Sequence, residues 1–222
     1  MTTTMDAASA VALEGRLSLL ALLRRAAVGF WHEIVRALLV GLVTLVCTAP
    51  VVLATAAGAP FWLVGLTGLP LALALTAAAS FAAAIARDER ASLRALGRID
   101  PLLAVIGTVL AAVSGAALGA PGSFPLLGAA LAAVLLLVSP LALGYGAVRQ
   151  RRGVAALRGG LILAAYRPSW TLSLLAIACL GGFAVAASAG VLMLVVPVLS
   201  LTIGATLIGT ELADIDAAQE QA

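Results

Sequence analysis

Residues 169–210 read SWTLSLLAIACLGGFAVAASAGVLMLVVPVLSLTIGATLIGT and contain no charged side chain. As a single α-helix these 42 residues would be roughly 63 Å long, because each residue adds about 1.5 Å. The hydrocarbon core of a bilayer is only about 30 Å thick. The stretch must therefore reverse its direction, and Ser188-Ala189-Gly190 is the best-placed turn. We expect a transmembrane hairpin with spans at 169–187 and 191–210.

The rest of the chain has the same apolar character. Of its 222 residues, 63% are hydrophobic and 10% are charged, whereas soluble domains are about half apolar and about a quarter charged. Two earlier hairpins are expected, and their spans are 34–58, 61–86, 102–120 and 124–148. The sequence thus predicts an all-α polytopic membrane protein, with six transmembrane helices in three hairpins across residues 31–210. Beyond Arg36 at the entry to the first span, no charge falls inside a predicted span, which disfavours a proton-coupled transporter.

The two ends of the chain are expected to lie outside the bilayer. Residues 1–30 form an N-terminal cytoplasmic or interfacial segment, and within it a helical repeat of apolar residues alternates with arginines. This pattern predicts an amphipathic helix on the membrane surface; the alternative is a plain cytoplasmic extension of the first span. Its apolar face would consist of Leu17, Leu20, Leu23 and Ala27. Residues 211–222 are expected to form an acidic cytoplasmic tail.

The arginines indicate the orientation of the chain. All 13 basic residues are arginine, and they lie in the N-terminal segment, at the entry to the first span and in the two long connections. Because positive residues accumulate on the cytoplasmic side, we expect both termini on the cytoplasmic side of a bacterial inner membrane. The same residues could contact lipid headgroups or an acidic partner, and topology alone also explains them. These candidate contact residues are Arg87, Arg90, Arg94, Arg98, Arg149, Arg151, Arg152 and Arg158. Their distribution follows topology, so nucleic acid is not an expected partner.

Small residues recur on the third predicted span. Gly107, Ala111, Gly115 and Gly119 are spaced four apart and predict a face on which another helix packs closely. Four prolines fall within predicted spans, where they can kink a helix or serve only structural roles. These prolines are Pro50, Pro70, Pro140 and Pro197.

No residue set for catalysis or metal binding stands out. His32 is the only histidine, and Cys47 and Cys179 are separated in apolar runs, so a zinc site is not expected. No nucleophile motif or phosphate loop is present. We therefore predict a protein that is not an enzyme and has no cofactor. A water-filled cavity lined by hydroxyls would instead indicate a conduit, and its candidate residues are Thr44, Thr48, Ser114 and Thr202.

Residues 40–60 read VGLVTLVCTAPVVLATAAGAP and follow Trp31. This order resembles the opening of the YesL-like family of bacterial membrane proteins of unknown function, whose first span ends in Leu-Pro-Val-Val-Thr. In this chain Ala49 and Leu53 stand where that pattern has Leu and Thr. The charged loop at 87–100 and the six-span total also fit. The resemblance implies an accessory role, since such proteins are often encoded beside carbohydrate ABC transporters.

Two other transport roles remain open. Val154-Ala155-Ala156 and Gly160, before Pro168, resemble the coupling segment through which importer permeases bind an ATPase, although the Glu of that segment is missing. A substrate-binding membrane subunit of an energy-coupling transporter also has about six spans. We expect an accessory or interaction subunit of a carbohydrate transport system, in contact with the lipid bilayer and with other membrane subunits or a cytoplasmic ATPase. The permease or substrate-binding subunit is the alternative.

Overall fold

The computed structural model describes residues 21–87, 89, 96–166, 168–188 and 190–220. This part of the chain is helical with short connections and contains no strand, which confirms the all-α class. A helix over residues 21–32 comes first. The elements that follow are α2 (Ile34–Ala56), α3 (Phe61–Thr67), α4 (Leu69–Ala86), α5 (Pro101–Leu118), α6 (Phe124–Arg149), α7 (Val154–Tyr166), α8 (Pro168–Ala187), the 3-10 helix η2 (Val191–Leu194) and α9 (Val196–Glu220).

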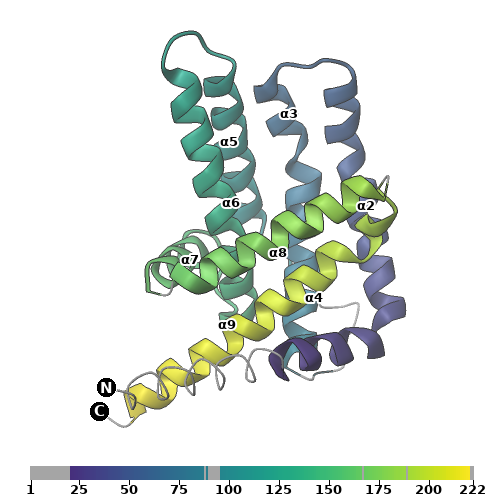
Figure 1. The fold of residues 1–222 in the computed structure, drawn as a ribbon, viewed down its shortest axis with the longest axis vertical. Coiled ribbons are helices and arrows are strands. Elements are labelled where there is room, and N and C mark those ends of the chain that lie inside the picture. The colour runs from purple at the N-terminus through teal and green to yellow at the C-terminus, as the bar shows by residue number, and fades with distance from the viewer. Residues whose placement is uncertain (1–20, 88, 90–95, 167, 189, 221–222) are drawn as a thin grey trace, which may run out of the picture.

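The chain is a multi-pass membrane protein. Helices α2, α4, α5, α6 and the Val196–Ala213 part of α9 are each long and apolar enough to cross a bilayer. Helix α7 and residues Thr171–Ala187 of α8 pass the same test together, although they meet at 109°. The described residues thus supply five spans, or six if this bent pair is one span. In Figure 1, α2, α4, α5 and α6 run along the long axis, whereas α8 and α9 cross it obliquely.

Helices α4 and α9 form the centre of the bundle. Half of the apolar window of each is buried, against 22% in α2, α5 and α6. The buried residues of α4 are mostly alanines, and small side chains allow neighbouring backbones to approach closely. One apolar cluster joins Phe30, Val40 and Phe81 to Val198 of α9. A second cluster joins Leu141 to the C-terminal half of α9. Because α9 belongs to both clusters, it connects the two halves of the fold.

The second predicted span is divided in the structure. Helix α3 ends at Thr67, and α4 begins at Leu69 after Gly68, whose N–H donates to the carbonyl of Gly65 at 3.1 Å. Pro70 lies in the first turn of α4, where a proline's missing N–H costs nothing. Pro197 is likewise the second residue of α9. Of these four prolines, only Pro50 and Pro140 lie beyond the first turn of a helix, in α2 and α6.

The connection predicted at residues 149–167 contains a helix that was not expected. Helix α7 packs against α6: Ala156 is fully buried, and a Cβ at Gly160 would lie 2.7 Å from the nitrogen of Ala142. The same alanine and glycine that suggested a coupling segment are therefore covered by α6. The exposed side of α7 carries Arg158 instead.

The C-terminal tail is not a separate segment. Helix α9 continues without a break to Glu220, so residues 211–220 of the expected tail extend the same helix as the last predicted span. The Val196–Ala213 window includes Glu211, which is buried and lies one residue beyond the expected span. The helix continues because Leu212 extends the apolar face that packs against the core. Acidic residues on the other faces do not interrupt a helix.

The described part of the N-terminal segment lies across one end of the bundle (Figure 1). Its helix buries Ala26 and Phe30, which are one turn apart, while Ala27 is exposed. An added Cβ on Gly29 would be 3.0 Å from the side chain of Ile85, so the helix contacts the end of α4. The apolar face predicted through Ala27 is therefore displaced by one residue. Leu17 and Leu20 lie outside the described residues.

Candidate functional site

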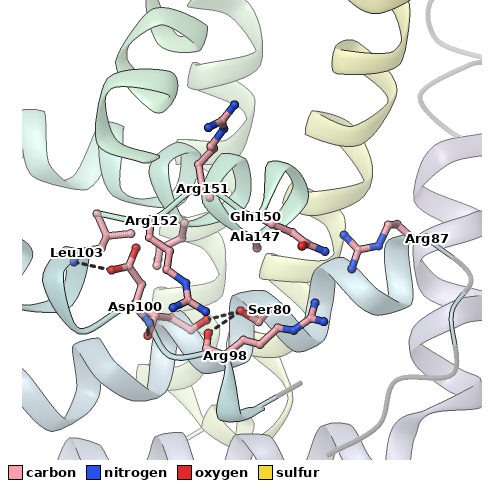
Figure 2. Close-up of a pocket in the computed structure, with 12 residues that line it drawn as sticks. Ser80, Arg87, Arg98, Asp100, Leu103, Ala147, Gln150, Arg151 and Arg152 are labelled. Atoms are coloured by element: carbon pink, nitrogen blue, oxygen red, sulfur yellow. Dashed lines mark hydrogen bonds between the residues drawn. The ribbon is translucent and has the colours of Figure 1, made fainter. Parts of the chain in front are cut away.

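A cavity of about 410 Å³ lies at the end of the bundle where α4 ends, α5 begins and α6 ends. Its charged and amide side chains come from two connections that are distant in sequence. They are Arg87, Arg98, Asp100, Gln150, Arg151 and Arg152 (Figure 2). We call this space the arginine cavity. It gathers four of the eight arginines that the sequence singled out, while Arg90 and Arg94 lie outside the described residues.

Asp100 holds the walls of the arginine cavity together. It is the N-cap of α5, and its Oδ1 accepts a hydrogen bond from the Leu103 N–H at 3.0 Å. Its Oδ2 accepts from the Gly153 N–H at 2.6 Å, in the connection between α6 and α7. The Asp100 N–H donates to Thr76 Oγ1 of α4 at 3.3 Å. One buried residue thus joins three elements. Hydrogen bonds to a charged carboxylate are about twice as strong as neutral ones.

Sequence reasoning treated Asp100 only as one charge in a loop. The overlooked signal is an aspartate directly before Pro101, since Asp is a favoured N-cap and Pro a favoured first helical residue. That signal predicts the bond to Leu103. It does not predict the bond to Gly153, because the two residues are 53 positions apart.

The connection between α6 and α7 has an unusual backbone. Gln150, the C-cap of α6, has φ 54° and ψ 30°, in the left-handed region. Gly153 has φ 56°, and a Cβ at this position would overlap the side chain of Leu102. Glycine is therefore required at residue 153 for both conformation and space. The resulting turn directs the Gly153 N–H toward Asp100 and carries Arg152 into the cavity.

The guanidinium groups approach the cavity from different elements. In Figure 2, Arg98 extends along the lower wall, Arg152 reaches down from the α6–α7 connection, and Arg87 faces Gln150. Arg151 points away from Asp100 in the same view. The Arg98 carbonyl accepts a hydrogen bond from Ser80 Oγ at 3.0 Å, which fixes that backbone against α4.

The charge of the arginine cavity is positive. Glu89 pairs with Arg87, with Nε 3.0 Å from Oε1. Among the residues that the structure describes, no carboxylate pairs with Arg98 or Arg152. The carboxylate of Asp100 is already engaged by two backbone N–H groups. The cavity therefore presents at least two guanidinium groups that can bind an anion.

An apolar crevice of about 200 Å³ adjoins the arginine cavity. It lies between α3, α4, α5 and α6, and Thr76, Leu103 and Leu143 line both spaces. Gly107 lies on its wall, and a Cβ added there would have no heavy atom within 4 Å. A charged space thus lies next to an apolar one.

The predicted small-residue face of α5 packs only in its middle. A Cβ at Gly115 would lie 2.6 Å from the carbonyl oxygen of Phe61, and a Cβ at Gly65 would lie 2.9 Å from the carbonyl carbon of Ala111. This is where α3 and α5 come closest. Gly107 instead faces the apolar crevice, and a Cβ at Gly119 would meet only carbonyls of its own helix.

The hydroxyls proposed to line a conduit donate hydrogen bonds to backbone carbonyls inside the bundle. Thr44 and Thr202 are fully buried, and their Oγ1 atoms donate to the carbonyls of Val40 and Val198 at 2.9 Å and 2.8 Å. Thr48 bonds the Thr44 carbonyl in the same way at 2.8 Å. Ser114 donates to the Gly128 carbonyl at 2.8 Å and connects α5 with α6. None of the four lines the arginine cavity or the apolar crevice.

The remaining candidate residues lie apart from the cavity. Arg149 pairs with Asp216 of α9, with Nη2 2.6 Å from Oδ1. Arg36 pairs with Glu33 at 2.7 Å on the exposed surface, and His32 Nδ1 lies 2.8 Å from the Val28 carbonyl. The described residues contain no group of three or more potential metal ligands. No family model, curated protein or solved structure matches the chain.

Proposed function

We propose that the chain is an accessory subunit that binds other membrane subunits of a transport system through α8. The observation that carries this proposal is the weak attachment of α8. Among the described side chains of α8, only Thr171 and Leu174 are buried. Large apolar side chains elsewhere on the helix are exposed: Leu180 by 68% and Phe183 by 74%.

The position of α8 supports the same role. It crosses the long axis obliquely (Figure 1), whereas α2, α5 and α6 run along that axis. A helix that is held by few contacts and lies across its neighbours offers a broad apolar face inside the bilayer. Close packing of such a face against another membrane subunit gains van der Waals contacts that fluid lipid does not supply. The YesL-like resemblance is the reason for proposing a bacterial, carbohydrate-linked system.

Photo-crosslinking in intact membranes tests this proposal. A photoreactive phenylalanine analogue at residue 183 should crosslink to a second membrane polypeptide. The matched control is residue 126 on α6, where Leu126 is 77% exposed. A crosslink at 183 that is absent at 126 is the expected result. If both positions yield only lipid adducts, or the same proteins, the accessory role through α8 is wrong.

The permease alternative rests on the outer face of α7. Val154, Leu161 and Ile162 are exposed there, and Arg158 lies on the same face at helical spacing. This face could bind a cytoplasmic ATPase. The alternative expects an ATPase to co-purify in mild detergent and Arg158→Glu to release it. Recovery of the same ATPase with Arg158→Glu would exclude α7 as its binding site.

We also propose that the arginine cavity faces the cytoplasm. The structure brings residues 96–100 and 149–153 to one end of the bundle through the Asp100–Gly153 hydrogen bond, and positive residues favour the cytoplasmic side. A chain with Cys47 and Cys179 replaced by alanine permits cysteine labelling in sealed cells. Ser123→Cys should react with a membrane-impermeant maleimide, and Arg158→Cys only after lysis. The reverse pattern would invert the orientation.

A further inference from the structure

We propose that the arginine cavity and the apolar crevice together bind one anionic lipid. Its phosphate would lie among the guanidinium groups, and one acyl chain would enter the crevice. No residue of α8 lines either space. Failure of either test therefore leaves the other proposal intact.

The polar half of the site fits a phosphate group. Arg98 and Arg152 reach into the cavity from opposite walls (Figure 2), and no described carboxylate pairs with either one. A guanidinium group binds phosphate oxygens through parallel N–H donors. Asp100 does not compete for these arginines as a paired anion would, since both of its oxygens accept backbone hydrogen bonds.

The apolar half of the site fits a hydrocarbon chain. Apolar side chains, seven of them from leucine, and three glycines including the open Gly107 line most of it. The hydroxyl of Thr108, which also lines the crevice, already donates to the Ala104 carbonyl at 2.8 Å. A free phosphate ion would gain nothing from such walls. An acyl chain would fill this space with van der Waals contacts, so the crevice favours a lipid over a free anion.

The depth of the site matches one leaflet. Along α5 the wall runs from Asp100 in the arginine cavity to Leu110 in the crevice. Ten residues of helix correspond to roughly 15 Å. This is about half of a hydrocarbon core of about 30 Å. A lipid with its headgroup at the charged end would therefore extend its chain toward the bilayer midplane.

Lipid binding to the purified, delipidated protein tests the proposal. The probes are phosphatidylglycerol, phosphatidylcholine with the same chains, and inorganic phosphate, and the readouts are bound lipid in native mass spectra and the shift in unfolding temperature. We expect phosphatidylglycerol to bind and stabilise the protein more than phosphatidylcholine does. The double variant Arg98→Gln/Arg152→Gln should lower its affinity by about 25-fold, since each arginine near an anionic group contributes about fivefold.

Two matched glycine variants test the crevice. Gly107→Leu should fill it and weaken phosphatidylglycerol binding. Gly182→Leu on α8 is the control, because a Cβ there also has no heavy atom within 4 Å. Arg158→Gln is the control for the arginine variants, since Arg158 is exposed and lines neither space.

Three outcomes would overturn the proposal. One is equal binding of the two lipids. Another is a double arginine variant that behaves like Arg158→Gln. The third is stabilisation by inorganic phosphate as strong as that by phosphatidylglycerol, with Gly107→Leu having no effect, which would assign the cavity to a free anion. Because Arg98 and Arg152 are exposed and make no described ion pair, their replacement is expected to leave folding intact. Gly107→Leu provides an independent test.

Discussion

Replacement of Asp100 by alanine removes the carboxylate whose hydrogen bonds connect α5 with the α6–α7 connection. The variant loses an N-cap, worth about 0.5–2 kcal/mol. It also loses the acceptor for the Gly153 N–H, and a hydrogen bond to a charged group contributes about 1.5–3 kcal/mol. Because Asp100 is buried, water cannot fully replace either bond. We expect a decrease of about 2–5 kcal/mol in the free energy of unfolding.

Asparagine at the same position separates the two contributions. Asn is a good N-cap, so the bond from the Leu103 N–H should survive. Its single side-chain oxygen cannot also accept from Gly153, because the second atom is an amide nitrogen that donates. Asp100→Asn should therefore lose about 1–3 kcal/mol, less than Asp100→Ala.

Unfolding by SDS in mixed micelles measures these differences. Asp216→Ala is the control, since it also removes an aspartate that connects two elements at this end of the bundle. The Arg149–Asp216 pair is 37% and 47% exposed, so its loss should cost only about 0–1 kcal/mol. If Asp100→Ala is no less stable than Asp216→Ala, the hydrogen bonds of Asp100 do not stabilise the fold as proposed. If Asp100→Asn loses as much as Asp100→Ala, the two-acceptor reasoning is wrong.

Two glycine pairs test the close approaches in the same assay. Gly115→Ala should lose about 1–3 kcal/mol, because its Cβ would press on the Phe61 backbone and push α3 from α5. Gly107→Ala should instead be neutral or gain up to about 1 kcal/mol, since its position is open and alanine favours helix; equal effects would contradict the packing. Gly153→Ala should lose more than Gly122→Ala: both have positive φ, but only residue 153 also crowds Leu102. A larger loss of stability at residue 122 would contradict the requirement for glycine at residue 153.

The cost of burying charge in lipid is local and additive along a chain, so sequence alone is a good guide to spans. The charge-free run at 169–210 predicted a hairpin, and the structure turns at Gly190, which has φ 88°. Helix α7 was missed because its buried residues are Ala156 and Gly160, which have little hydrophobicity. The burial of these residues depends on α6.

The arginine cavity shows a second feature that the sequence reveals only in part. The sequence identified its arginines as a set, because charge is visible one residue at a time. It did not show that Arg98 and Arg152 share one space, nor that Asp100 joins their two connections. Those facts depend on residues 53 positions apart meeting in space.

The sequence by itself determined a multi-pass helical membrane protein. Long apolar runs without charge are unfavourable in water, so they must lie in lipid. Only the tertiary structure decided which helices are central and which are peripheral. It buried Glu211, left α8 exposed, and placed an apolar crevice beside the arginines. The physical reason is that packing depends on which small residues meet. Gly65 and Gly115 lie in different helices, and they permit a close approach that neither helix specifies alone.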